Sequence, residues 1–269
     1  MDWTAIVFAL IVMGVLGAAF GVVLSIADKK FAVEEDLRAT AIREVLAGAN
    51  CGACGYAGCD AFAEAVARGE APVTGCFPLG VKGKQAIADI MGISVGHIEE
   101  KAARVFCQGF CEAAKERYKY EGLESCALAS TLAGGPKQCT SACLGMGDCQ
   151  RACPFGAIKI ENGIAKVYSA KCVACGKCVL ACPRNLIHIL PADDVVFVAC
   201  QNHDAPKVAR SACTNACICC GRCIKACVNG AIEIVDNCAI IDQAKCTRCG
   251  ACERVCPVHC IRDMTGLPA

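Results

Sequence analysis

The sequence has few aromatic residues, which limits the core that the chain can build by apolar packing alone. Phenylalanine, tyrosine and tryptophan make up 5% of its 269 residues. A chain so poor in large core residues needs another source of stability, and bound metal centres supply one in many small domains. The composition therefore favours a fold that depends on metal ligation.

An excess of charge of one sign is also missing. The formal net charge is +1, and the sequence has no basic arm or RNA-binding aromatic motif, so we expect no nucleic-acid partner. It also has no nucleophile elbow, phosphate loop, acid–base constellation or G-x-G-x-x-G motif. We therefore expect no catalytic residues and no nicotinamide site in this chain.

Cysteine is abundant instead. The 28 cysteines exceed the roughly one-tenth share that signals a disulfide or metal scaffold. A secreted disulfide framework is one explanation. However, runs of C-x2-C-x2-C in tandem are typical of iron–sulfur clusters. The arrangement predicts cluster ligation in a reducing compartment.

Residues 4–27 form a run without charge. At about 1.5 Å per residue such a helix is about 36 Å long, which exceeds the roughly 30 Å hydrocarbon core of a membrane. Lys29 and Lys30 follow it and predict a single-pass anchor with the other domains on the cytoplasmic side of a bacterial cell membrane. A cleaved signal peptide and a buried core helix are the alternatives, but no positive n-region or A-x-A cleavage site is clear.

The first cysteine group follows a predicted helix over residues 34–49. The sequence NCGACGYAGC supplies Cys51, Cys54 and Cys59, and Cys76 follows at a distance. Zinc also accepts four thiolates but usually takes them from two C-x2-4-C pairs. A triple plus a distant single cysteine fits a 4Fe-4S cluster better.

An internal repeat dominates the second half of the chain. Eight cysteines recur after 74 residues: Cys139, Cys143, Cys149, Cys153, Cys172, Cys175, Cys178 and Cys182 match Cys213, Cys217, Cys223, Cys227, Cys246, Cys249, Cys252 and Cys256. The segments CPFGAIKIENGIAKVYSAKC and CVNGAIEIVDNCAIIDQAKC align between them without a gap. This period marks a duplicated module.

The second module resembles a bacterial two-cluster ferredoxin, in which the fourth cysteine of each run binds the other cluster. Its C-x2-C-x2-C-x3-C run recurs after 29 residues, with a strand hairpin predicted around Asp236 and Asn237. The resemblance implies two ligand sets: Cys217, Cys220 and Cys223 with Cys256, and Cys246, Cys249 and Cys252 with Cys227.

The first module has Met146 where a cysteine is expected. A thioether is a poor substitute for a thiolate, and Cys139 lies close enough in sequence to replace it. We therefore expect Cys139, Cys143 and Cys149 with Cys182, and Cys172, Cys175 and Cys178 with Cys153. A three-iron cluster is the alternative. In the second module Cys213 and Cys220 compete for one place, and the regular spacing favours Cys220.

Among the remaining cysteines, Cys107 and Cys111 lie at helical i, i+4 spacing. Cys107, Cys111, Cys126 and Cys200 are candidate ligands of a sixth cluster, and ordinary buried thiols are the alternative. Cys219, Cys238 and Cys260 are expected to be passive, and the four histidines are expected to be structural or on the surface.

Three features occur in a distinctive order: an apolar span ending in KKFAVEED, the CGACGYAGC motif with Cys76, and tandem ferredoxin modules ending in CPVHC. Together they resemble the B subunits of Rnf complexes over essentially the whole chain, in the longer form of anaerobes. The resemblance implies a membrane complex that moves electrons from reduced ferredoxin to NAD⁺ and exports Na⁺ or H⁺. Other Rnf subunits, soluble ferredoxin as donor and membrane lipid are the implied partners.

Two other functions compete with this one. The first is a membrane-anchored polyferredoxin that carries electrons without ion pumping, and the second is a structural zinc array without a redox role.

The expected fold is α+β, with five 4Fe-4S clusters, or six if the remaining cysteines bind one. The expected divisions are an anchor (1–28), a small helical 4Fe-4S domain (29–92), a helical cysteine-bearing connector (93–135), a ferredoxin-like module (136–191), a connector (192–212) and a second such module (213–269).

Overall fold

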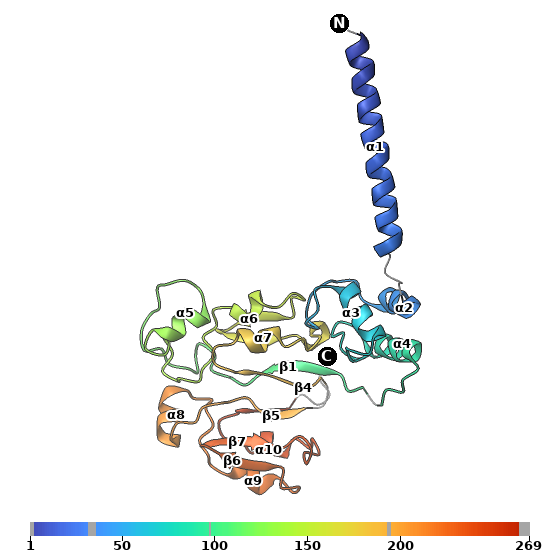
Figure 1. Ribbon diagram of the computed structural model, residues 1–269. Helices are drawn as coiled ribbons and strands as arrows, with labels where there is room; N and C mark the ends of the chain where they lie inside the picture. The colour runs from blue at the N-terminus through green and yellow to red at the C-terminus, as the bar shows by residue number, and fades with distance from the viewer. Residues whose placement is uncertain (1–2, 32–35, 97, 193–194, 264–269) are drawn as a thin grey trace.

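The computed structural model describes residues 3–31, 36–96, 98–192 and 195–263 (Figure 1). Helix α1 spans Trp3–Phe31 and contains an apolar window, Leu10–Ala27, that is long enough to cross a membrane. Its apolar side chains, such as Phe8, Leu16 and Leu24, are exposed. The helix therefore has the length and the apolar surface predicted for a membrane anchor.

A small helical domain follows α1. It consists of α2 (Leu37–Val45), α3 (Cys59–Ala67) and α4 (Val81–Met91), with the cysteine loop between α2 and α3. The Asp36 carboxylate caps α2 by accepting a 2.9 Å hydrogen bond from the Arg38 amide. Ile42, Phe62, Val66 and Ile87 form the centre of its core and are at most 1% exposed. The helix predicted over residues 34–49 is present as α2, although residues 34 and 35 lie outside the described ranges.

The first cysteine-rich unit contains two pairs of antiparallel strands. Strands β2 (Ile158–Glu161) and β3 (Ile164–Val167) form a hairpin, and β1 (Lys101–Val105) pairs with β4 (Ile187–Pro191). Four short helices complete the unit: α5 (Cys126–Thr131), α6 (Asp148–Arg151), η1 (Ser169–Lys171) and α7 (Lys177–Ala181).

The predicted helical connector over residues 93–135 is therefore wrong in part. Residues Lys101–Val105 form a strand, because pairing with β4 outweighs the local helical spacing of the segment. The helical content of the connector among its described residues is α5 alone.

The second unit has the same plan. The hairpin of β6 (Ile232–Val235) and β7 (Cys238–Ile241) turns at Asp236 and Asn237, as predicted, and both turn residues have positive φ. Strand β5 (Val196–Val198) pairs with β8 (Ile261–Asp263). Helices α8 (Pro206–Ala212), α9 (Arg222–Ala226) and α10 (Ala251–Arg254) accompany them. The segment 192–212 is thus part of the folded unit, because it supplies a strand and a helix.

In both repeats a strand that precedes the ferredoxin-like sequence pairs with the last strand of the unit. A cysteine follows that strand at the same distance: Cys107 comes two residues after β1, and Cys200 two residues after β5.

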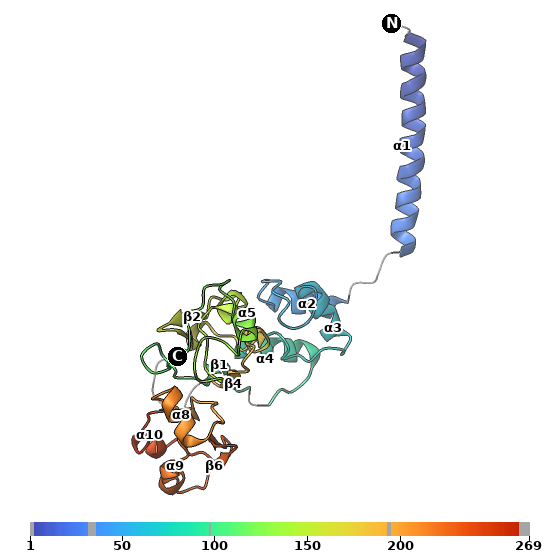
Figure 2. The ribbon, with the colours of Figure 1, turned by 90° about the vertical axis from the view of Figure 1, so that its left-hand side faces the viewer.

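Two views show α1 projecting from the rest of the chain, with α2–α4 nearest to it and the second unit farthest away (Figures 1 and 2). The first unit lies between them.

Phe62 is the largest fully buried side chain of the helical domain, and its ring meets that of Tyr56 edge to face at 5.6 Å. Replacing Phe62 with alanine is expected to destabilise this domain by about 3–5 kcal/mol, because it removes a buried ring and leaves a cavity. Pulse proteolysis in urea, with cleavage mapped to residues 37–91, measures the change. The matched control is Leu37→Ala on α2, where the side chain is 84% exposed. Equal urea midpoints for the two variants would contradict the assignment of this core.

Candidate iron–sulfur cluster sites

The cysteine loop of the helical domain encloses a cavity of about 350 Å³ lined by Cys51, Cys54, Cys59 and Cys76. The Asn50 side-chain oxygen accepts a 2.8 Å hydrogen bond from the Cys59 amide and so fixes the start of α3. The structure therefore brings the four predicted cysteines of this group together around one space.

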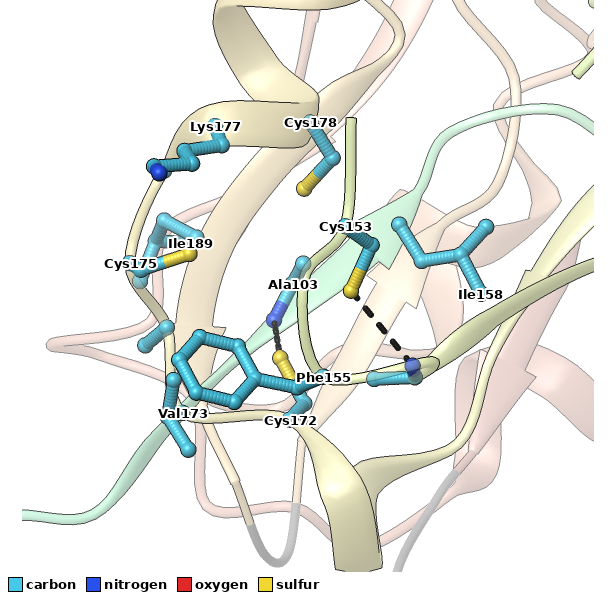
Figure 3. Close-up of a pocket in the computed structure, with 13 residues that line it drawn as sticks. Ala103, Cys153, Phe155, Ile158, Cys172, Val173, Cys175, Lys177, Cys178 and Ile189 are labelled. Atoms are coloured by element: carbon cyan, nitrogen blue, oxygen red, sulfur yellow. Dashed lines mark hydrogen bonds between the residues drawn. The ribbon is translucent and has the colours of Figure 1, made fainter. Parts of the chain in front are cut away.

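A second cavity, of about 310 Å³, lies in the first unit and is lined by Cys153, Cys172, Cys175 and Cys178 (Figure 3). Backbone amides point at two of the sulfurs. The Ala103 amide donates to Cys172 Sγ at 3.3 Å, and the Ala157 amide to Cys153 Sγ at 3.4 Å. These four residues are one of the two sets expected for this module.

The first two cavities are linked by a lysine. Lys177 is the first residue of α7 and lies between Cys175 and Cys178 in the sequence; its Nζ donates to the Cys51 carbonyl oxygen at 2.8 Å. The contact joins the cysteine loop of the helical domain to the cysteine loop of the first unit.

The second unit contains two further cavities. Cys217, Cys220, Cys223 and Cys256 line the first, of about 350 Å³, and Cys227, Cys246, Cys249 and Cys252 line the second, of about 320 Å³. Both sets agree with the cross-ligated arrangement that the ferredoxin resemblance implies. Cys219 and Cys260 also line the first of these cavities.

A fifth cavity, of about 290 Å³, is lined by Cys107, Cys139, Cys200 and Cys213, and we call it the junction cavity. The sequence did not suggest this set. Each repeat contributes two of its cysteines: Cys139 and Cys213 are related by the 74-residue period, and Cys107 and Cys200 occupy equivalent places after β1 and β5. The junction cavity therefore lies between the two units and is built from both.

The hydrogen bonds at the junction cavity repeat the same symmetry. The Cys143 amide donates to Cys107 Sγ at 3.3 Å, and the Cys217 amide donates to Cys200 Sγ at 3.4 Å. Residues 143 and 217 are again 74 positions apart. Buried Asn202 adds a side-chain amide bond to Cys139 Sγ at 3.2 Å. Backbone amides of Asn215 and Ala216 donate to Cys213, so all four sulfurs accept N–H groups.

The sequence predicts Cys139 in a set with Cys143, Cys149 and Cys182. In the structure Cys139 lines the junction cavity with Cys200 and Cys213. Cys126 lies beside the other three cysteines of the predicted set. Burial, followed by the neighbouring thiols of Cys143, Cys126 and Cys182, raises the pKa of Cys149 to about 12.

Cys126 is the first residue of α5, and the Asp148 carboxylate holds this end of the helix. Asp148 Oδ2 accepts hydrogen bonds from Ser125 Oγ at 3.1 Å and from the Ala127 amide at 2.9 Å. Met146 packs against the small cluster that contains Cys126. Cys126, which lies 20 residues before Met146 in the sequence, is therefore close to both Met146 and Cys149.

Of the four residues proposed for a sixth site, the structure brings only Cys107 and Cys200 together. Cys126 joins a different set, and Cys111 lies beside Gly163 and lines none of the five cavities. The helical i, i+4 spacing that grouped Cys107 with Cys111 does not apply, because the chain is not helical there.

Cys238 and Cys260, which the sequence predicts to be passive, contact candidate ligands. A hydrogen bond from the Cys238 thiol lowers the pKa of Cys200 to about 7. The Cys260 thiol lies 3.7 Å from Cys256 Sγ, and their hydrogen bond lowers the pKa of Cys256 to about 5. Hydrogen bonds from Cys238 and Cys260 also lower the pKa of Cys217. These two thiols favour the thiolate form that iron requires.

The cavities suit a cluster better than a single metal ion. Within the described ranges, no three His, Cys, Asp or Glu side chains converge as closely as a single ion requires. Zinc–sulfur bonds of about 2.3 Å would demand such convergence. Each of the five cavities is lined by at least four cysteines, and amides donate to sulfurs at the cavity of the first unit and at the junction cavity, as expected around iron–sulfur clusters.

Comparison with known families agrees with this chemistry. The family model for an Fe-S cluster matches residues 46–78, that for a 4Fe-4S dicluster domain matches residues 135–183, and that for a 4Fe-4S binding domain matches residues 239–262. The matched segments contain cysteines of all three cysteine-rich parts of the chain, so 4Fe-4S binding domains are present in the chain.

Curated relatives match over nearly the whole chain. The B subunit of the Na(+)-translocating ferredoxin:NAD(+) oxidoreductase complex of Acetobacterium woodii is 46% identical over 93% of this chain and 75% of the relative. The B subunit of the proton-translocating complex of Clostridium ljungdahlii is 41% identical over 96% of this chain and 92% of the relative. The B subunit of the ion-translocating oxidoreductase complex of Methanosarcina acetivorans is 39% identical over 96% and 98%.

Removing iron is expected to unfold the second unit before the helical domain. Six of the twelve buried residues in the core of the second unit are cysteines, against one of eleven in the helical domain. Hydrogen exchange after oxidation and chelation measures the loss of amide protection in each part. We expect exchange in β5–β8 to reach the unfolded rate while α3 keeps part of its protection. Equal loss of amide protection in both parts would contradict a structural role for the bound clusters.

Proposed function

The chain belongs to the family of B subunits of ion-translocating ferredoxin:NAD⁺ oxidoreductase complexes, and we propose that it accepts electrons from reduced ferredoxin and relays them to partner subunits of such a complex. The bound 4Fe-4S clusters supply the one-electron carriers at low potential. The partner subunits reduce NAD⁺ and couple this reaction to export of Na⁺ or H⁺. Helix α1 anchors the chain in the membrane, with the cysteine-rich units on the cytoplasmic side.

The chain holds six clusters through 24 of its 28 cysteines. Four sets are those expected from the sequence: Cys51, Cys54, Cys59 and Cys76; Cys153, Cys172, Cys175 and Cys178; Cys217, Cys220, Cys223 and Cys256; and Cys227, Cys246, Cys249 and Cys252. The fifth set lines the junction cavity, and Cys126, Cys143, Cys149 and Cys182 form the sixth.

The junction cavity is the observation that carries this proposal. In the first unit, the Cys143 amide donates to Cys107 Sγ at the junction cavity. In the second unit, the Cys217 amide donates to Cys200 Sγ at the same cavity. At the other end of the first unit, Lys177 contacts the Cys51 carbonyl. A continuous series of short contacts therefore supports a path from the second unit, through the first, to the helical domain beside the anchor.

This arrangement gives the two ends of the chain different roles. The second unit lies farthest from α1 in both views and is the entry point for electrons from soluble ferredoxin. The helical domain lies nearest to α1 and delivers them to the membrane subunits. A membrane-anchored polyferredoxin without a pump remains the alternative, and isolation of the chain without polytopic membrane subunits would favour it.

The two cysteines Cys213 and Cys220 test the ligand sets. Because they line different cavities, each alanine variant is expected to lose about four iron atoms, and the double variant about eight. Iron and sulfide analysis of anaerobically purified protein measures this. Cys219→Ala is the control, since Cys219 lines the same cavity as Cys220 and belongs to no proposed set. If the two cysteines were alternatives for a single place, each single variant would keep all its iron.

The function itself is tested in the anaerobically purified complex with reduced ferredoxin as donor and NAD⁺ as acceptor. Cys139→Ala is expected to lower the rate of NAD⁺ reduction at least tenfold, because it removes a ligand from the junction cavity. Cys111→Ala is the control. Unchanged NAD⁺ reduction in Cys139→Ala, with the junction iron lost, would contradict the proposed path.

A further inference from the structure

Lys137 is a buried cation in the centre of the first unit. Its residue is 4% exposed, and its Nζ donates to the carbonyl oxygens of Gly109 at 2.9 Å and Gly163 at 3.0 Å. None of the ion pairs within the described ranges includes it. Burying an ammonium group without negative charge nearby costs several kcal/mol. The surroundings of Lys137 must therefore supply a negative charge by another route.

The candidate ligands held by the adjoining backbone are Cys107 and Cys143, whose sulfurs accept hydrogen bonds from the amides of Gly109 and Ala165. As thiolate ligands of iron–sulfur clusters, these sulfurs would carry the negative charge. Cys107 and Cys213 line the junction cavity, whereas Cys143 belongs to the set with Cys126. Lys137 thus acts on cysteines of two neighbouring sites.

The two carbonyl contacts fix the ammonium in this position. Gly109 follows Cys107 by two residues, and the Gly109 amide donates to Cys107 Sγ at 3.3 Å. Gly163 lies in the β2–β3 turn, immediately before β3, and the amide of Ala165 in β3 donates to Cys143 Sγ at 3.4 Å. The same backbone segments that hold Lys137 therefore donate to the sulfurs on either side of it.

We propose that Lys137 sets the reduction potentials of the clusters held by the junction cysteines and by the Cys126–Cys143–Cys149–Cys182 set. This inference rests on the proposed function, because it requires both clusters. Reduction transfers one electron from reduced ferredoxin and adds one negative charge to a site, with no bond broken. A fixed positive charge in a low-dielectric interior stabilises the reduced form and raises the potential.

The repeat offers an internal comparison. The residue 74 positions after Lys137 is Ser211, which is neutral. The second unit therefore lacks this charge at the equivalent position, although the cysteines that the two units contribute to the junction cavity are equivalent. The charge is a feature of the path between the units rather than a general requirement of the ferredoxin-like fold.

The test is a potentiometric titration followed by EPR in the full-length protein. Lys137→Gln removes the charge but keeps an N–H donor for a carbonyl, and it is expected to lower the equilibrium constant for reduction of two clusters at least tenfold. This corresponds to about 59 mV for one electron. Lys137→Arg keeps the charge and is expected to restore the wild-type values. Lys115→Gln is the matched control, because Lys115 is exposed and belongs to the same unit.

Each outcome decides the proposal. A fully loaded Lys137→Gln protein with wild-type potentials would overturn it. If Lys137→Gln instead loses iron, restoration of loading by Lys137→Arg supports the need for charge, and equal loss in the arginine variant refutes it. Wild-type protein without six clusters would refute the proposed function, and this result is visible in the iron count before any variant is made.

Discussion

The bonding of cysteine sulfur to metal is the interaction on which the cysteine-rich units depend. Their strands are three to five residues long and pair only two at a time, and isolated two-stranded pairs are at most marginally stable in water. Half of the buried core of the second unit is thiol. Apolar packing therefore stabilises the helical domain, whereas metal ligation must stabilise the two ferredoxin-like units.

Duplication explains how a new site arose between the units. Each copy carries a cysteine before its first ferredoxin motif and another after the strand that pairs with its last strand. Within a single copy these two cysteines form half of a ligand set. Placing two copies together completes the set in the junction cavity, with equivalent amides, those of Cys143 and Cys217, donating to equivalent sulfurs. The same contact that joins the units thus brings the four cysteines of the junction cavity together.

The spacing of its cysteines predicts the set at Cys51, and the ferredoxin resemblance implies both sets of the second unit. The cysteines of each set line one cavity in the structure. The junction cavity and the role of Cys126 were not predictable in this way. Cys107 and Cys200 reach the junction only because β1 and β5 pair with strands more than 60 residues away, and Cys126 reaches its set only because Asp148 holds α5. These are tertiary contacts that a motif does not encode.

The differences between the two copies bear on the direction of transfer. The first copy has Met146 and Lys137 where the second has Cys220 and Ser211. Two identical copies would place equivalent sites at equal potentials and give electrons no preferred direction from the copies themselves. A buried cation in the first copy alone makes sites on that side easier to reduce than they would be without it. Divergence after duplication therefore supplies an asymmetry that symmetric ligation cannot, and this asymmetry lies in the unit next to the helical domain that follows α1.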